Sequence, residues 1–235
     1  MALQSWLRAK ARAAVDGLFC SSSPYVQRIG DKDSGWVIHT SPLPVVCYCA
    51  GVGKGISFEL ELAKIAPRPV LVFDPSPTGI ATIEQLHTAN LTFYPVGLAA
   101  QSGTVEFSLP LDPGEGSYSV AREGIQTIAF DCWDLPAIMR QHGDHSIDLL
   151  KMDIEGFEYD IVDRLLDQGI PIRQICVEFH PWLAPGRTWK TIARLYKAGY
   201  RIIHKHRGDH TFLIKDHRFI QLMQIYSPSP VRPRA

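Results

Sequence analysis

The chain has 235 residues, of which 46% are hydrophobic, and its 24 Lys and Arg residues balance 24 Asp and Glu residues. This composition excludes a disordered or fibrous protein, and the zero formal net charge gives no electrostatic reason to expect a nucleic-acid partner. No apolar run approaches the roughly 20 residues that a membrane-spanning helix needs. Residues 1–15 lack the apolar core of a signal peptide, and the five cysteines have no paired spacing. We therefore predict a cytoplasmic protein.

The chain divides into three predicted segments. Residues 1–40 should form an N-terminal helix and a short strand packed on the body, residues 41–226 one main domain, and residues 227–235 a disordered tail. The strand of the first segment is expected at 35–39, before a Thr-Ser-Pro sequence that ends it. The main domain opens with a β-rich run at 44–49, which is typical of a strand buried on both faces. Nothing in the sequence indicates an oligomeric state.

From residue 44 onward, apolar strand-like runs alternate with helix patterns. Further strands are expected at 70–73, 91–94, 147–152, 174–179, 200–204 and 211–215. Helices are expected after residue 55 and at 79–88, 133–141, 157–167 and 188–198. Strands separated by helices of about 10–15 residues predict an α/β, doubly wound domain with a mostly parallel sheet. Because the last two strands are close in sequence, we expect them to pair antiparallel, with a reversed strand at one edge.

Segment 97–130 breaks this alternation. Residues 104–107 alternate polar and apolar side chains, and glycine and proline gather at 110–116. This pattern predicts a β-hairpin-like insertion, which we expect to act as a lid or as one wall of a ligand site. Asp131 could face a pocket, but the Asp-Cys-Trp-Asp sequence at 131–134 favours a helix N-cap at Asp131.

The residues that follow the first two strands of the main domain indicate a ligand, because ligands of open α/β sheets bind beyond the carboxyl ends of the strands. Gly51, Gly53 and Gly55 follow the first strand, where they allow close backbone approach and lead into a helix N-terminus. Asp74 follows the next strand and can accept hydrogen bonds from both hydroxyls of a ribose. This succession predicts an adenosine-containing ligand. Because position 56 is isoleucine, the dinucleotide fingerprint lacks its third glycine, which favours S-adenosylmethionine over a dinucleotide.

Further polar side chains follow the next two buried strands. Asp153 and Glu155 stand two residues apart where strand 147–152 ends, and they project to the same side if the chain stays extended. Glu158 could join them or could merely serve the start of the next helix. His180 follows the next strand and is a candidate base, although a lone histidine is more often structural.

Five motifs along residues 45–179 carry a resemblance to a known family. The most specific is Asp-Leu-Leu-Lys-Met-Asp-Ile-Glu-Gly-Phe-Glu at 148–158. The others are Gly-Val-Gly-Lys-Gly-Ile-Ser-Phe-Glu at 51–59, Phe-Asp-Pro at 73–75, Val-Gly-Leu-Ala at 96–99 and Val-Glu-Phe-His at 177–180. Together they make the chain similar to the FkbM-type methyltransferases, whose DLLKxDxEGxE signature the first motif resembles and which use S-adenosylmethionine. The resemblance implies a single-domain class I methyltransferase fold, which is Rossmann-like, and O-methylation of a hydroxyl on a sugar, polyketide or other small metabolite.

The resemblance also implies roles for individual residues. The residues implied to bind the cofactor are Gly51, Val52, Gly53, Ser57, Asp74, Pro75, Gly97 and Leu98, with Asp74 as the ribose anchor. Asp153 falls where the family's acidic residue lies near the transferred methyl group. The chain departs from the family at Cys49, where many members carry an acid two places before the first glycine, and at Asp74, where many carry glutamate.

Methyl transfer to an alcohol requires that the acceptor oxygen, the methyl carbon and the sulfur lie in line. It also requires a group that takes the hydroxyl proton. We expect His180 or Asp153 to take that proton and Glu155 to orient the acceptor, which would be a small molecule or a glycan. Alternatively, Asp153, Glu155 and His180 could hold a divalent cation such as Mg²⁺ that acidifies the hydroxyl. A nucleotide-binding dehydrogenase and a non-catalytic module that binds S-adenosylmethionine are further alternatives.

Overall fold

The structure is a computed structural model that describes residues 24–84, 86, 88–112, 114 and 116–215. The predicted N-terminal helix and the predicted disordered tail lie outside the described residues. Within these residues no helix is long and apolar enough to cross a membrane, and Cys47, Cys49, Cys132 and Cys176 are buried and free.

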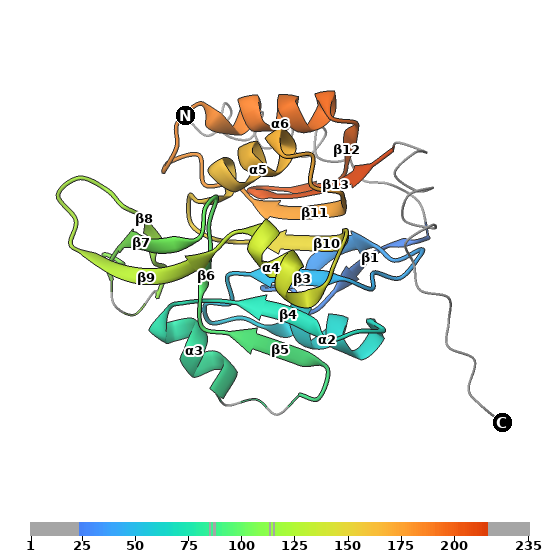
Figure 1. Ribbon diagram of the computed structural model, residues 1–235, viewed down its shortest axis with the longest axis horizontal. Coiled ribbons are helices and arrows are strands. Elements are labelled where there is room, and N and C mark those ends of the chain that lie inside the picture. Colours follow the sequence, from blue (N-terminus) through green and yellow to red (C-terminus); the bar gives the residue numbers. More distant parts are fainter. Residues whose placement is uncertain (1–23, 85, 87, 113, 115, 216–235) are drawn as a thin grey trace, which may run out of the picture.

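A seven-stranded sheet runs through the molecule in the order β12-β13-β11-β10-β3-β4-β5 (Figure 1). Its strands are β3 (Cys47–Ala50), β4 (Val70–Phe73), β5 (Leu91–Tyr94), β10 (Ile147–Met152), β11 (Ile172–Glu178), β12 (Tyr200–His206) and β13 (Asp209–Ile214). The five strands from β11 to β5 are parallel, whereas β13 is antiparallel to both β11 and β12. The predicted mostly parallel sheet is therefore confirmed, and its reversed strand is β13, next to the edge strand β12.

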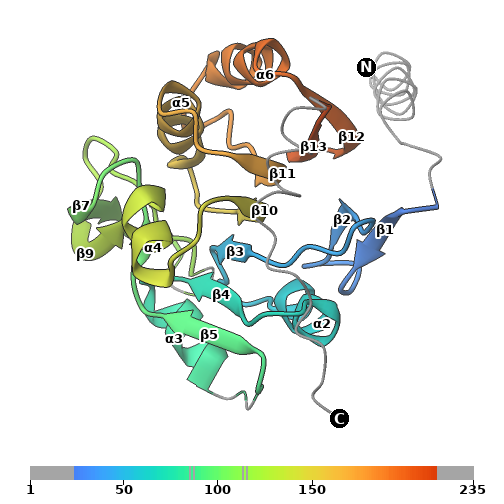
Figure 2. The same ribbon diagram turned by 45° about the vertical axis from the view of Figure 1, so that its right-hand side comes forward.

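Helices cover both faces of this sheet, as a doubly wound fold requires (Figure 2). They are α2 (Ser57–Ile65), α3 (Pro77–Glu84), α4 (Leu135–His142), α5 (Glu158–Asp167) and α6 (Arg187–Lys197). Successive residues of a strand point to opposite faces, so Leu149 packs in the apolar cluster under α2 while Leu150 packs in the cluster under α4, α5 and α6. Because both faces are covered, β3 and β4 consist of buried and mostly apolar residues, and this explains why their positions could be predicted.

A smaller sheet and a separate hairpin complete the described fold. The sheet has the order β6-β9-β7-β8 and contains β6 (Gly97–Leu98), β7 (Gly103–Ser108), β8 (Ser119–Val120) and β9 (Thr127–Trp133). Because β7 and β9 pair antiparallel, the predicted hairpin-like insertion is present, and it extends to one side of the main sheet (Figure 1). The hairpin joins β1 (Val26–Ile29), which was not predicted, to β2 (Trp36–His39).

The predicted N-cap at Asp131 is wrong. Asp131 lies inside β9, opposite Thr104 of β7, because the cross-strand pairing of the insertion continues to Trp133. The cap of α4 is Asp134, whose carboxylate accepts a hydrogen bond from the amide of Ala137 at 2.8 Å.

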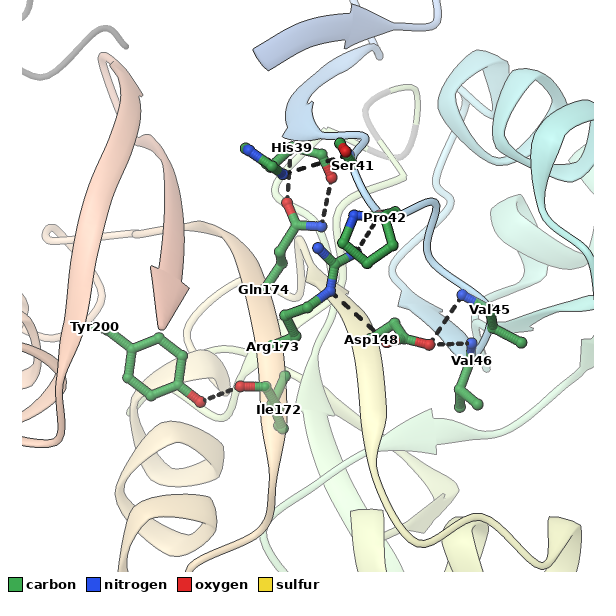
Figure 3. Close-up of polar contacts among 10 residues, drawn as sticks. All are labelled: His39, Ser41, Pro42, Val45, Val46, Asp148, Ile172, Arg173, Gln174 and Tyr200. Carbon is green, nitrogen blue, oxygen red and sulfur yellow. Dashed lines mark hydrogen bonds and ion pairs between the residues drawn. The ribbon is translucent and has the colours of Figure 1, made fainter. Parts of the chain in front are cut away.

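A buried polar network fixes the amino ends of β10 and β11 (Figure 3). The carboxylate of Asp148 accepts hydrogen bonds from the amides of Val45 and Val46, both at 2.9 Å, and lies 3.7 Å from the guanidinium of Arg173. Arg173 in turn donates to the carbonyl of Pro42 at 2.9 Å. Asp148 begins the 148–158 signature, yet it lies at the end of the sheet opposite to Asp153. Its role in this structure is to hold the chain that enters β3.

Replacing Asp148 by alanine should lower the free energy of unfolding by about 3 kcal/mol, because it leaves a buried guanidinium and two amides without their partner. Urea denaturation measures this change. Glu61→Ala removes one partner of the exposed Lys64–Glu61 pair and should change the same quantity by less than about 1 kcal/mol. Equal effects of the two substitutions would contradict the structural role of Asp148.

Candidate active site

A cavity of about 1190 Å³ opens at the carboxyl ends of β3, β4, β10 and β11. Its walls come from the loop after β3, the ends of the neighbouring strands, the β1–β2 turn and the insertion. Seven of the eight residues predicted to bind the cofactor line it: Gly51, Val52, Gly53, Asp74, Pro75, Gly97 and Leu98. Ser57, the first residue of α2, is not among the lining residues. Its hydroxyl accepts a hydrogen bond from the amide of Asp31 at 2.8 Å and contacts that of Ser34 at 2.8 Å.

The glycine loop begins where the ends of β3 and β10 come closest. Gly51 has a φ of +83°, and a Cβ at this position would lie 1.7 Å from the carbonyl oxygen of Asp153. Both the conformation and the contact therefore require glycine. Gly53 has a φ of +51°, but a Cβ there would meet no atom within 4 Å. The backbone at Gly53 is thus open to the cavity.

The carboxylate of Asp74 holds this loop through hydrogen bonds to its backbone amides. One carboxylate oxygen accepts the amides of Val52 and Gly53 at 2.7 and 3.0 Å, and the other accepts the amide and hydroxyl of Ser76 at 2.8 and 2.6 Å. Gly79 allows this placement, because a Cβ there would come within 2.2 Å of the carboxyl group. All four of these bonds lie within the chain, so contact with a ribose requires that a hydroxyl replace one of them.

Asp153, Glu155 and His180 meet at the carboxyl ends of β10 and β11. Nε2 of His180 lies 3.8 Å from a carboxylate oxygen of Asp153 and 3.5 Å from one of Glu155. One ligand atom from each of the three residues falls within 4.8 Å of the others. The two acids line the cavity, and the Asp153 side chain is 38% exposed. His180 is 2% exposed and lies behind them, outside the lining residues.

Glu158 fixes the orientation of this cluster. One oxygen of its wholly buried carboxylate accepts the amide and Nδ1 of His180 at 2.9 and 3.2 Å, and the other accepts the amide of Gly156 at 2.8 Å. Burial disfavours a charged imidazole, but the hydrogen bond and charge of Glu158, together with Glu155 and Asp153, outweigh burial and raise the pKa of His180 to about 9. The sequence left open whether Glu158 joins the cluster or only begins α5. In the structure it does both.

The insertion also contacts the turn between β10 and α5 that carries Glu155. Glu155 has a φ of +50°, which is unusual for a residue with a side chain, and its carbonyl accepts the amide of Val120 in β8 at 3.0 Å. Burial raises the pKa of the Glu155 carboxyl group, although the charge of His180 opposes this. The constrained backbone aims Glu155 into the cavity and links its position to the insertion.

Sequence reasoning gave no role to two further acids of the cavity, Glu178 and Asp209. They are register partners at the ends of β11 and β13. Burial, followed by the charges of Asp153 and Asp209, raises the pKa of Glu178 to about 7. Glu178 lies inside the 177–180 motif, so the signal for it was present. Asp209 precedes the predicted last strand, and only the tertiary pairing of β13 brings it to the cavity.

The parallel sheet with one reversed strand beside its edge, and the glycine loop and acids at the carboxyl ends of its strands, define a class I methyltransferase domain. Residues 31–202 match the model of the Methyltransferase FkbM domain. The chain therefore belongs to the FkbM methyltransferase family, whose members depend on S-adenosylmethionine. This assignment is to a methyltransferase family, so it gives no support to the dehydrogenase alternative.

The chain is also similar to a solved structure. The FkbM methyltransferase from Methylobacillus flagellatus KT has 13% sequence identity and a TM-score of 0.48. The match covers 75% of this chain and 46% of that protein, so this chain spans less than half of that protein's length. No curated protein matches the sequence.

The lining residues of the cavity are of the kinds that S-adenosylmethionine needs. The open space over Gly53 leaves room for a ligand against the loop backbone. Leu98 and Phe107 offer apolar surface for an adenine ring, and the carboxylates of Asp153 and Glu155 lie where a positively charged sulfonium would be stabilised.

Proposed function

We propose that this domain transfers a methyl group from S-adenosylmethionine to a hydroxyl oxygen of a small metabolite, a sugar or a glycan in the cytoplasm. The observation that carries the proposal is the contact between Gly51 and the backbone of Asp153. It brings the proposed cofactor loop and an acid that lines the cavity together in one site. When bound, the cofactor supplies a methyl carbon activated by its sulfonium.

Asp153 is the residue that we assign to the hydroxyl proton. An alcohol is neutral at physiological pH, so its proton must pass to a nearby acceptor as the bond to carbon forms. Asp153 is accessible from the cavity, whereas the imidazole of His180 is buried behind it. Glu155 orients the acceptor hydroxyl, and His180 holds both acids through Nε2.

Transfer of an isotopically labelled methyl group tests this proposal. The purified protein is incubated with labelled S-adenosylmethionine and fractionated cytosolic metabolites and glycans, and products are analysed by mass spectrometry. The proposal predicts a label on an oxygen atom. A label on nitrogen or carbon would contradict it, and cofactor binding with no labelled product would favour the non-catalytic alternative.

A metal-assisted reaction is the second candidate, and the cluster of Asp153, Glu155 and His180 favours it. Glu158 accepts a hydrogen bond at Nδ1, which directs Nε2 toward the two carboxylates, as in the carboxylate–histidine arrangement that supports many metal ligands. These residues could bind a divalent cation, which would acidify the acceptor hydroxyl.

Chelation distinguishes the two forms of the proposal. If a metal takes part, treatment with EDTA should lower activity about tenfold or more, and added Mg²⁺ or Mn²⁺ should restore it. The variant Glu158→Gln should then need about 10–100 times more metal for half-maximal activity. Activity that is unchanged by EDTA would leave Asp153 as the proton acceptor without metal assistance.

A further inference from the structure

A buried ion pair lies directly beneath the glycine loop. Glu59 of α2 is 1% exposed and Lys151 of β10 is 3% exposed, and their charged atoms are 3.3 Å apart. Apart from this ion pair, neither carboxylate oxygen of Glu59 has a hydrogen-bond partner in the described part of the chain. The ammonium group of Lys151 also donates a hydrogen bond to the carbonyl of Gly51.

The Glu59–Lys151 ion pair is expected to contribute little to the stability of the fold. Charges removed from water stabilise a fold only when further hydrogen bonds satisfy them. The Asp148–Arg173 pair at the opposite end of the same strands has such bonds on both partners, because its carboxylate accepts two backbone amides and its guanidinium donates to a carbonyl through one terminal nitrogen, although Nε of Arg173 has no hydrogen-bond partner among the described residues. Glu59 has none, so its retention in the core calls for a reason other than stability.

The position of Lys151 supplies that reason. Lys151 lines the cavity and contacts the loop carbonyl at Gly51, while Asp74 holds the loop amides at Val52 and Gly53. The loop is therefore held at its carbonyl side by a cation and at its amide side by an anion. Glu59, in the first turn of α2, is the partner that anchors the ammonium group at this point, because its carboxylate lies 3.3 Å from that group.

We propose that Glu59 and Lys151 are positioning residues that set the glycine loop for S-adenosylmethionine. The inference rests on the proposed function. It predicts that the pair controls the affinity for the cofactor and contributes little to folding. Neither residue is assigned a part in proton transfer.

The direct test replaces the pair by neutral side chains of similar size and measures cofactor binding by isothermal titration calorimetry. The variant Glu59→Gln/Lys151→Met should unfold cooperatively within about 5 °C of the wild type, since a buried pair can be exchanged for neutral groups without loss of stability. Its dissociation constant for S-adenosylmethionine should rise about tenfold or more. In steady-state assays KM for the cofactor should rise while kcat stays within about threefold.

A second variant tests whether the affinity for S-adenosylmethionine depends on a negative charge beside Lys151. Cys49 is the register partner of Lys151 in the neighbouring strand β3, so the side chains of the two residues lie on the same face of the sheet. Burial together with the charge of Glu59 raises the pKa of the Cys49 thiol. Cys49→Asp in the Glu59→Gln background returns a carboxylate to Lys151 and should restore most of the affinity. Asp148→Asn is the matched control, because it disturbs a buried pair remote from the cavity and should lower stability without weakening cofactor binding.

Wild-type affinity in a folded Glu59→Gln/Lys151→Met variant would overturn the inference. So would failure of Cys49→Asp to restore affinity in a folded protein, or a loss of affinity in Asp148→Asn as large as that in the double variant. Failure of the wild-type protein itself to bind S-adenosylmethionine would instead contradict the proposed function.

Discussion

Asp153→Asn should lower kcat by about 100- to 10,000-fold and raise the dissociation constant for S-adenosylmethionine by about tenfold or less, because Glu155 keeps a carboxylate beside the sulfonium. Asparagine keeps the shape of the side chain and its contact with the cavity, but it cannot take a proton from an alcohol. Asp153 lines the cavity, and its backbone abuts Gly51, so the acceptor hydroxyl and the activated methyl carbon would meet beside it. Steady-state kinetics together with calorimetric titration separate the two effects.

The control for this experiment is Asp160→Asn, which removes an exposed carboxylate of α5 that pairs with Arg187 away from the cavity. It should leave both kcat and cofactor affinity unchanged. Wild-type turnover in Asp153→Asn would remove Asp153 from proton transfer, and Glu178, which lines the same cavity, would become the residue to replace next.

The second large effect is expected for Gly51→Ala, which should raise the dissociation constant for S-adenosylmethionine about 100-fold or more. The new Cβ would lie 1.7 Å from the carbonyl oxygen of Asp153, so either the loop or the end of β10 must move. The φ of +83° adds conformational strain. Calorimetric titration measures the affinity, and urea denaturation measures the accompanying loss of stability.

Gly169→Ala provides the matched control for strain without collision. Gly169 has a φ of +62°, but a Cβ there would meet no atom within 4 Å, and it lies outside the residues that line the cavity. This variant should lose about 1–2 kcal/mol of stability and bind the cofactor normally. If Gly51→Ala bound S-adenosylmethionine as tightly as Gly169→Ala, the loop after β3 would not be the cofactor loop.

β3 and β4 could be predicted because burial on both faces makes each of them a continuous apolar run. β10 and β11 could be predicted from shorter apolar runs, although they also contain buried polar residues such as Asp148 and Arg173. β1 could not, because its four residues combine polar and apolar side chains and its burial depends on pairing with β2. The N-cap of α4 was misplaced for a related reason. Asp131 and Asp134 are both suitable caps, and only the pairing of β9 with β7 decides between them.

Site residues could be predicted where a local sequence motif determines their position. They could not be predicted where contacts between distant parts of the chain determine it. The sequence predicted that Asp153, Glu155 and His180 would meet, since all three follow parallel strands. It could not indicate that Glu158 holds the imidazole of His180, because the helix start offers the same residue a local role. Nor could it indicate the buried role of Glu59, since a charged helix residue ordinarily faces water.

Calorimetric titration of the purified wild-type chain with S-adenosylmethionine, alongside the demethylated product and NADH, probes the assignment most directly. Saturable one-to-one binding of the methyl donor, competition by the product and no binding of NADH are the results we expect. A chain that took up NADH, or that gave no binding signal with the methyl donor, would contradict the assignment of this cavity to S-adenosylmethionine.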